Sequence, residues 1–139
     1  GDAAILARFL LYRTYHGCAM SPAIQQASIA AWNDEAHVAA NRALYREKFD
    51  AVTPLLAAPL QAQRPDAGFY LWARTPIADT EFALGLQREY NVTVLPGSYL
   101  ARRADDGNPG EGFVRIALVA TLPECLEAAR RINAFCERL

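Results

Sequence analysis

Apolar residues recur at helical spacing over the first part of the chain and gather into short, strand-like runs after residue 57. The first helical stretch begins at Asp2, a residue able to cap a helix, and ends at Gly17. It is apolar almost all round, and a helix of that kind has to be enclosed by other elements. We therefore expect residues 1–20 to pack against a surface that lies outside the rest of this chain.

A second, much longer helix is predicted from Ser21 to about Leu56. Ser21 and Pro22 form a helix start, and neither Gly nor Pro occurs between Pro22 and Pro54. Apolar side chains recur every seven residues, at Ile24, Ala31, Val38, Tyr45 and Val52. The polar residues 33–35 interrupt this stripe, so we expect a bend or a short break there. A helix of this length bridges two domains or supports a subunit contact, although a helix that merely backs a sheet has the same pattern.

Residues 57–139 alternate strand and helix signals. The predicted strands are short and rich in β-branched and aromatic residues: Phe69–Ala73, Val92–Leu95 and Gly112–Ala120. One helix is expected to be capped by Asp79 and to end at Asn91, and the last helix opens with the capping box Thr121–Glu124. A polar, Gly-rich loop, residues 102–112, lies between the second and third strands. The predicted fold is α/β, of the α+β small-domain kind: a three-stranded sheet with helices on one face, plus the long interdomain helix. Its expected divisions are 1–20, 21–56 and 57–139.

The third predicted strand carries a single cation, Arg115, among seven apolar residues in a stretch of nine. A run of this composition is typical of a strand buried on both faces, with Arg115 on the same face as Phe113, Ala117 and Val119. A guanidinium keeps its proton, so at such a site it needs an anionic partner. The neighbouring residues supply no obvious carboxylate, which makes a ligand one candidate. The alternatives are an edge strand whose Arg extends to water, or an acid from elsewhere in the fold.

Composition excludes several functions. The chain has 139 residues with a net charge of -1, which gives no electrostatic footprint for nucleic acid or for an anionic membrane. No apolar run is long enough to span a bilayer. Two histidines, His16 and His37, form no metal-ligand spacing, and Cys18, Cys125 and Cys136 lack a C-x-x-C pattern. Free thiols, buried at Cys125 and Cys136, and a reducing, cytoplasmic setting are expected.

Three motifs resemble those of the class I aminotransferases that depend on pyridoxal phosphate, the fold type I enzymes. Pro96-Gly97-Ser98-Tyr99-Leu100, followed by Phe113-Val114-Arg115-Ile116-Ala117, resembles the P-G-S-x-F and x-R-[IL]-x pattern near the end of these proteins. Gly68-Phe69-Tyr70-Leu71-Trp72 is similar to the family's G-x-F-Y strand, and Ser21–Ala27 is similar to the start of its interdomain helix. The resemblance covers nearly the whole chain, in order and in spacing.

The resemblance implies a role for one residue and the absence of others. Arg115 matches the arginine that grips the α-carboxylate of the amino or keto acid substrate. In the family, the cofactor is held by a large domain that precedes this segment, through a Schiff-base lysine. The only lysine here, Lys48, lies on a charged helical face and is expected to be solvated. We therefore expect no catalytic, cofactor-binding or metal-binding residue in this chain, and no pyridoxal phosphate bound to the chain alone.

The same resemblance implies partners and leaves some roles open. It implies a parent enzyme that joins this C-terminal portion to the missing N-terminal large domain and forms a homodimer, in which the turn Tyr15–Cys18 reaches towards the neighbour's cofactor. The substrate side could be lined by Tyr70, Ser98, Tyr99 and Arg102. No role is assigned to these four residues or to His16.

Residues 11–17, 96–102 and 112–120 resemble the branch of the family that exchanges an amino group between N-succinylated amino-keto acids and glutamate during lysine synthesis. Three alternatives remain: a lyase or decarboxylase that uses the same cofactor, an aminotransferase-like sensor domain of a transcription regulator, and a free-standing amino-acid-binding module.

Overall fold

The computed structural model describes residues 1–17 and 19–139, and contacts divide it into two compact units, Gly1–Ala39 and Ala40–Leu139. Cys18 lies outside the described residues, and so does its part of the predicted turn. Within the described part of the chain, no helix has both the length and the apolar character needed to cross a bilayer. The three-way division expected above remains a prediction.

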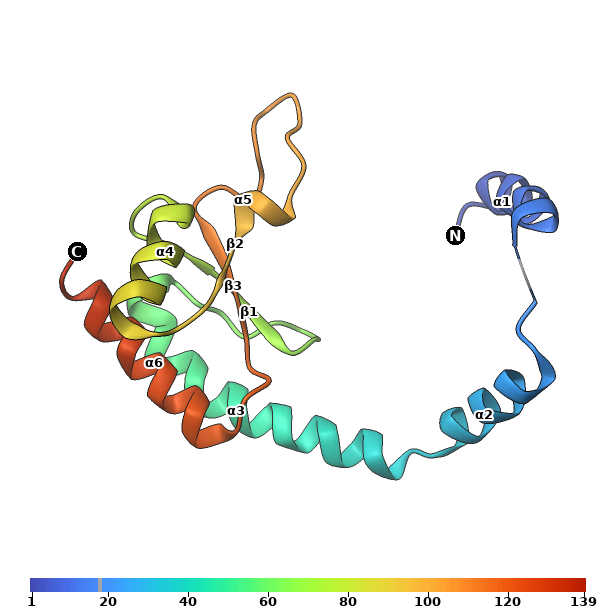
Figure 1. Ribbon diagram of the computed structural model, residues 1–139, viewed down its shortest axis with the longest axis horizontal. Coiled ribbons are helices and arrows are strands. Elements are labelled where there is room, and N and C mark those ends of the chain that lie inside the picture. The colour runs from blue at the N-terminus through green and yellow to red at the C-terminus, as the bar shows by residue number, and fades with distance from the viewer. Residues whose placement is uncertain (18) are drawn as a thin grey trace. The chain divides into compact units, whose positions relative to one another are not determined.

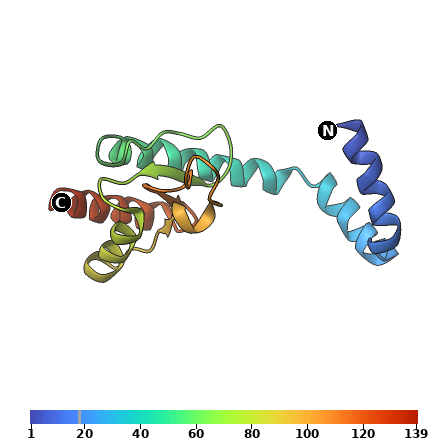
Figure 2. The same cartoon turned by 90° about the horizontal axis from the view of Figure 1, so that it is seen from above.

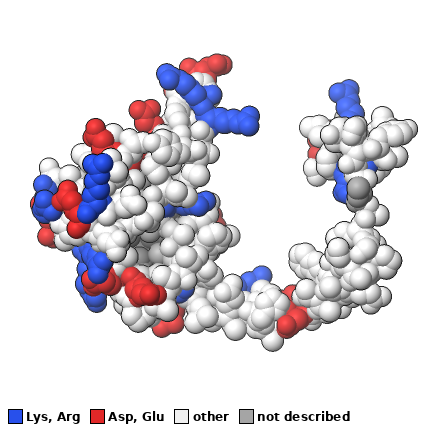
Figure 3. Space-filling model, viewed as in Figure 1, with Lys and Arg blue, Asp and Glu red and all other residues white. Residues whose placement is uncertain are grey.

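The first unit contains the helices α1 (Ala3–His16) and α2 (Pro22–Asn33). Both predicted starts are confirmed, because Asp2 Oδ1 accepts from Ile5 N at 3.0 Å and Ser21 Oγ accepts from Ile24 N at 3.5 Å. Neither helix buries a residue, and Trp32 is 79% exposed. Figure 3 shows the visible surface of these helices as mostly uncharged. The apolar side chains that suggested an enclosed helix have no cover within this unit.

The long helical region is broken where its apolar stripe lapses. Helix α2 ends at Asn33, and α3 (Ala36–Leu60) begins after Asp34, whose Oδ1 accepts from Ala36 N at 3.1 Å. The predicted break is therefore confirmed, but α3 continues four residues past Leu56. Its last turn contains Pro59, which cannot donate to the Leu55 carbonyl. Asn133 Nδ2 donates to that carbonyl at 3.1 Å, so α6 satisfies the acceptor that the proline leaves free.

The second unit contains a three-stranded antiparallel sheet in the order β1-β3-β2 (Figure 1). Its strands are β1 (Tyr70–Arg74), β2 (Leu95–Pro96) and β3 (Phe113–Ala117). The strand expected at 92–95 is wrong in extent, because only Leu95 of that range pairs with β3. Val94 is buried without joining the ladder. A short helix that the sequence pattern did not predict, α5 (Gly97–Leu100), follows β2 directly.

Helices α3, α4 (Asp79–Tyr90) and α6 (Leu122–Cys136) supply the helical side of the core, and α3 and α6 run side by side (Figures 1 and 2). One face of the sheet is packed into that core, because Leu71, Ala73 and Val114 are 0% exposed. Intervening residues such as Trp72 and Arg115 are exposed or only half-buried. The expectation of burial on both faces is therefore wrong for β3. As predicted, the helices cover only one face of the sheet. The opposite face of the sheet, which carries Trp72 and Arg115, is left open.

The predicted features of α6 are its capping box and two buried cysteines. The capping box is present, with Thr121 N donating to Glu124 Oε2 at 2.9 Å. Cys125 is a buried free thiol as expected, whereas Cys136 is only half-buried. Burial raises the pKa of both thiols, so both are protonated at neutral pH.

Two neighbouring leucines of α3 test the position of the core. Leu56 is 0% exposed and Leu55 is 37% exposed. Leu56→Ala should lower the free energy of unfolding by about 2–5 kcal/mol, because it leaves a cavity, whereas Leu55→Ala should cost less than about 1 kcal/mol. Denaturant titration followed by circular dichroism measures both values. Equal losses in the two variants would contradict the placement of the core.

Candidate functional site

Arg115 lies at the centre of the open sheet face. It occupies the middle strand, opposite Trp72 of β1 and Leu95 of β2. Its side chain is half-buried, and its Cζ lies 5.7 Å from the centre of the Tyr70 ring. Over residues 1–17 and 19–139, no carboxylate forms an ion pair with it. The Nε atom is buried without a hydrogen-bond partner among those residues. The edge-strand and protein-acid alternatives are thus not what the structure shows, and the guanidinium can still take an anion.

Aromatic rings surround this cation and were missed as a group by the sequence analysis. Trp72 and Phe113 stack with ring centres 5.7 Å apart, and the Arg74 guanidinium lies 5.4 Å from the Phe113 ring centre. Alternation along β1 predicts part of this group, because Tyr70, Trp72 and Arg74 share one face of that strand. The open sheet face therefore consists largely of aromatic side chains, with the guanidinium groups of Arg115 and Arg74 beside them.

Asp79 holds the backbone around this face in place. It was expected to cap α4, but it is the first residue of that helix, and Ala78 occupies the cap position. Its buried carboxylate instead accepts from Ser98 N at 2.9 Å and from Gly112 N at 3.4 Å. Burial by itself would raise the pKa of Asp79, but hydrogen bonds from Ser98 and Gly112 outweigh it and leave the pKa below its ordinary value. One carboxylate thus joins α4, α5 and the residue before β3.

The Gly-rich loop is tied back onto α5. Asn108 Nδ2 donates to the Ser98 carbonyl at 2.9 Å, and Asn108 Oδ1 accepts from Gly110 N at 3.0 Å. Gly97 and Gly110 pack backbone to backbone, so that a Cβ on Gly97 would collide with the Gly110 carbonyl. Glycine is required at this crossing because no side chain fits. The ordered loop enters β3 from this crossing.

Lys48 has a structural position that the sequence did not predict. Its Nζ donates to the Leu118 carbonyl at 3.0 Å and lies 5.0 Å from the Tyr45 ring centre. The expectation of a solvated lysine is therefore wrong, because α3 uses it to hold the chain just after β3. This ammonium is bound to a carbonyl and lies beside the helix-covered side of the sheet. The expectation that this chain contributes no cofactor-binding residue remains a prediction.

The other residues named from the sequence are placed as follows. Tyr70 lies beside Arg115, and Ser98 acts through its backbone, as described above. Tyr99 is 76% exposed and Arg102 is exposed. His16 stacks on Tyr12, with the ring centres 4.7 Å apart, within the first unit. No group of three or more His, Cys, Asp or Glu side chains suited to a metal occurs in the described part of the chain.

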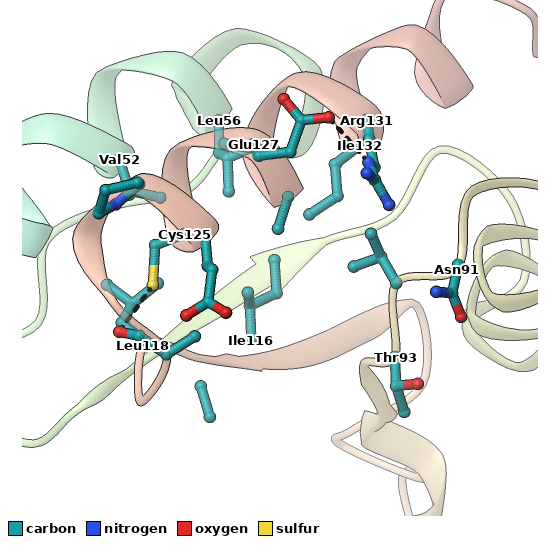
Figure 4. Close-up of a pocket in the computed structure, with 17 residues that line it drawn as sticks. Val52, Leu56, Asn91, Thr93, Ile116, Leu118, Cys125, Glu127, Arg131 and Ile132 are labelled. Atoms are coloured by element: carbon teal, nitrogen blue, oxygen red, sulfur yellow. Dashed lines mark hydrogen bonds and ion pairs between the residues drawn. The ribbon is translucent and has the colours of Figure 1, made fainter.

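A pocket of about 580 Å³ is lined by Ile116 and Leu118, which alternate with Arg115 along the chain and so face the other side of the sheet (Figure 4). Its floor includes Ile116 and Leu118, and its rim carries the ion pair of Glu127 with Arg131, whose Nε lies 3.0 Å from Glu127 Oε1. Arg131 also donates to the Tyr90 carbonyl at 3.2 Å. Its guanidinium is already compensated, so Arg115 and Arg74 are the better anion-binding candidates.

Removing the charge of Asp79 should reveal its role. In Asp79→Asn, the side-chain NH2 group faces a backbone N–H of Ser98 or Gly112, so one of these two hydrogen bonds is lost. We expect the free energy of unfolding at pH 7 to fall by about 1–3 kcal/mol. The pKa of Asp79 is lowered by folding, so its stabilising effect is present above the pKa of the unfolded chain, about 4, and disappears as pH falls through the folded value. Denaturant titrations from pH 7 to pH 3 measure this. The exposed Glu81→Gln on the same helix turn is the control, and a gap that grows towards low pH would contradict the assignment.

Comparison with known proteins places this geometry in a family. Residues 4–132 match the family described as aminotransferase class I and II. An LL-diaminopimelate aminotransferase of Nitratidesulfovibrio vulgaris is 39% identical over 114 residues, which are 79% of this chain and 28% of that protein.

Two solved structures add to this. An aminotransferase of Neisseria meningitidis Z2491 is 53% identical, with a TM-score of 0.84 over 97% of this chain and 35% of its own. A probable N-succinyldiaminopimelate aminotransferase of Thermus thermophilus is 41% identical, with a TM-score of 0.54 over 69% of this chain and 24% of its own. The chain thus spans about a quarter to a third of the length of these relatives. By sequence and by fold, it belongs to the class I and II aminotransferase family.

Proposed function

We propose that this chain acts as the C-terminal portion of a transaminase that uses pyridoxal phosphate, and that Arg115 binds the α-carboxylate of its amino or keto acid substrates. The observation that carries the proposal is a guanidinium on an open sheet face, with a buried Nε and no carboxylate partner in the described residues. A guanidinium fork binds a carboxylate through two parallel hydrogen bonds, and every amino or keto acid substrate carries an α-carboxylate.

For the reaction, we propose exchange of an amino group between an N-succinylated amino-keto acid and glutamate, as in lysine synthesis. The name of the Thermus thermophilus protein, a probable N-succinyldiaminopimelate aminotransferase, supports the succinylated substrate. The name of the Nitratidesulfovibrio vulgaris protein, an LL-diaminopimelate aminotransferase, supports the diaminopimelate part alone. Both names refer to diaminopimelate, and they differ in whether an amine carries a succinyl group.

Arg115 contributes to such a reaction by orientation. A two-pronged grip on the α-carboxylate fixes the rotation of the substrate about its Cα, and so selects the Cα bond that is broken. The Arg115 guanidinium packs on the Tyr70 ring, which limits where it can point. Hydrogen bonds from Ser98 and Gly112 to Asp79 hold the backbone just before β3, and so hold the strand that carries Arg115. The cofactor supplies the electron-withdrawing chemistry and is held, in this proposal, by protein outside this chain.

The proposal also includes partners and a location. The exposed apolar side chains of α1, among them Leu10 at 69% and Tyr15 at 78%, are suited to packing against the preceding large domain and a second subunit. We propose a homodimeric, cytoplasmic enzyme in which residues 1–20 belong with the large domain, residues 21–56 connect the domains, and residues 57–139 form the small domain.

Arg115→Ala in the complete enzyme should lower kcat/KM for amino acid substrates by about 30-fold or more. Truncating one partner of a desolvated, charged hydrogen-bonded pair costs about 2–5 kcal/mol, and each 1.4 kcal/mol is about a factor of ten. Arg115→Lys should also be costly, because it loses the planar fork. The absorption spectrum of the bound cofactor should change little. Arg130→Ala, an exposed arginine of α6, is the control, and kcat/KM of Arg115→Ala within about threefold of wild type would rule the assignment out.

The 139-residue chain by itself should not form a covalent adduct with pyridoxal phosphate at Lys48. The reason is that this ammonium donates to the Leu118 carbonyl, whereas a Schiff-base lysine has to be free to attack the aldehyde of the cofactor. Incubation with pyridoxal phosphate, reduction with borohydride and peptide mapping by mass spectrometry measure the modification. Stoichiometric labelling of Lys48 would show that this chain holds the cofactor itself.

A further inference from the structure

The open sheet face has a second place for an anion, at the end of β1. A pocket of about 330 Å³ is lined by Gln61, Gln63, Trp72, Arg74 and Phe113. Its lining includes one guanidinium and two side-chain amides, and no acidic residue of the described chain lines it. Arg74 forms no ion pair with any residue in 1–17 or 19–139. The pocket therefore offers donors for a carboxylate and an amide, and has nothing to neutralise an ammonium group.

The end of α3 directs the chain to this pocket. Gln61 has a φ of 49°, one of two non-glycine residues with positive φ in the described chain. It follows α3 immediately, between the buried residues Leu60 and Ala62. This left-handed residue ends α3, because Ala62 N donates to the Leu56 carbonyl at 3.3 Å, the bond that closes many helix ends. The turn carries Gln61 and Gln63 to the edge of β1.

The strand register relates this pocket to Arg115. Arg115 is opposite Trp72, and Phe113 is opposite Arg74, so the two arginines are diagonal neighbours on one face. Diagonal neighbours on one face of a sheet lie about 7–8 Å apart, and their Cβ atoms are somewhat closer. The stacked pair of Trp72 and Phe113 fills the surface between them. An elongated molecule with a carboxylate at each end that lay across these rings would bring one carboxylate towards each guanidinium group.

We infer that Gln61, Gln63 and Arg74 form the subsite for the remote end of the substrate, and that they select an acylated end with an amide and a carboxylate over a free amine. This inference rests on the proposed function, because Arg115 is taken to hold the α-carboxylate. The two amides are matched to the acyl amide, and the guanidinium to the terminal carboxylate. LL-diaminopimelate also has a carboxylate at its remote end, but its free ammonium group would lie next to Arg74, and the pocket lining has no acidic side chain to pair with that ammonium, which is unfavourable.

The test uses the complete enzyme with its cofactor and three amino donors: N-succinyl-LL-diaminopimelate, LL-diaminopimelate and alanine. Wild type should prefer the succinylated compound to the free diamine. Arg74→Gln should raise KM for the succinylated donor about 10- to 100-fold, the range expected for loss of a hydrogen bond to a charged group, with kcat nearly unchanged. Alanine has no remote end, so its kcat/KM should stay within about threefold.

Further variants separate charge from geometry. Arg74→Lys should fall between wild type and Arg74→Gln, because it keeps the charge and loses the fork. Gln63→Ala should raise KM for the succinylated donor with no effect on alanine. Arg130→Gln, on the exposed side of α6, is the matched control and should leave all three donors unchanged. Circular dichroism and thermal unfolding of each variant exclude a folding defect, which is not expected because Arg74 is exposed.

The outcomes separate the two proposals. Unchanged KM for the succinylated donor in Arg74→Gln, or equal use of the two diaminopimelates by wild type, would overturn the subsite while leaving the transaminase proposal intact. Equal loss for alanine and for the succinylated donor would also overturn it, because the role of Arg74 would then be general to the fold. A wild-type enzyme that transfers no amino group from any donor would overturn the proposed function itself.

Discussion

The alternation of side chains along β3 is the constraint on which this structure depends. Val114 and Ile116 point into the core with the side chains of α3, α4 and α6, and Arg115 between them has to point the other way. A guanidinium in that core would lack a carboxylate and would cost several kcal/mol. Because β3 is the middle strand, its cation lies at the centre of the open face and not at its rim. The fold therefore presents a charge where a ligand, or another part of a protein, has to meet it.

Hydrogen bonds to Asp79 hold the backbone that leads into β3 and so fix the position of Arg115. Loops of about ten residues, such as the one before β3, are mobile unless their backbone groups find partners. Here one buried carboxylate accepts from residues on both sides of the loop, Ser98 and Gly112, and Asn108 closes the loop from within. The crossing of Gly97 and Gly110 allows the two backbones to approach closely enough for these bonds to form. The position of Arg115 is thus set by its strand, and the position of its strand by groups more than thirty residues away in sequence.

Features encoded locally could be predicted from the sequence, and features created by tertiary contact could not. Capping by Asp2 and Ser21, the break after Asn33 and the capping box at Thr121 depend on neighbouring residues, and all were found. Lys48 and Asp79 were misplaced because their partners, Leu118 and Gly112, are distant in the chain. The burial of β3 on both faces was inferred from composition, which cannot distinguish a face covered by helices from a face left open. The site was identified through Arg115, but its aromatic surroundings required the register with β1.

Two features of the chain remain unsatisfied within their own units, and each calls for a different kind of partner. In the first unit, α1 and α2 bury nothing, and short helices without a packed face are marginal in water. In the second unit, the open face combines exposed aromatic rings with a buried Nε that lacks a hydrogen-bond partner among the described residues. Apolar helices require protein surface, whereas a guanidinium beside aromatic rings is matched by an anion of limited size. Within the proposed function, the helices bind the rest of the enzyme, and the open sheet face is left for substrate.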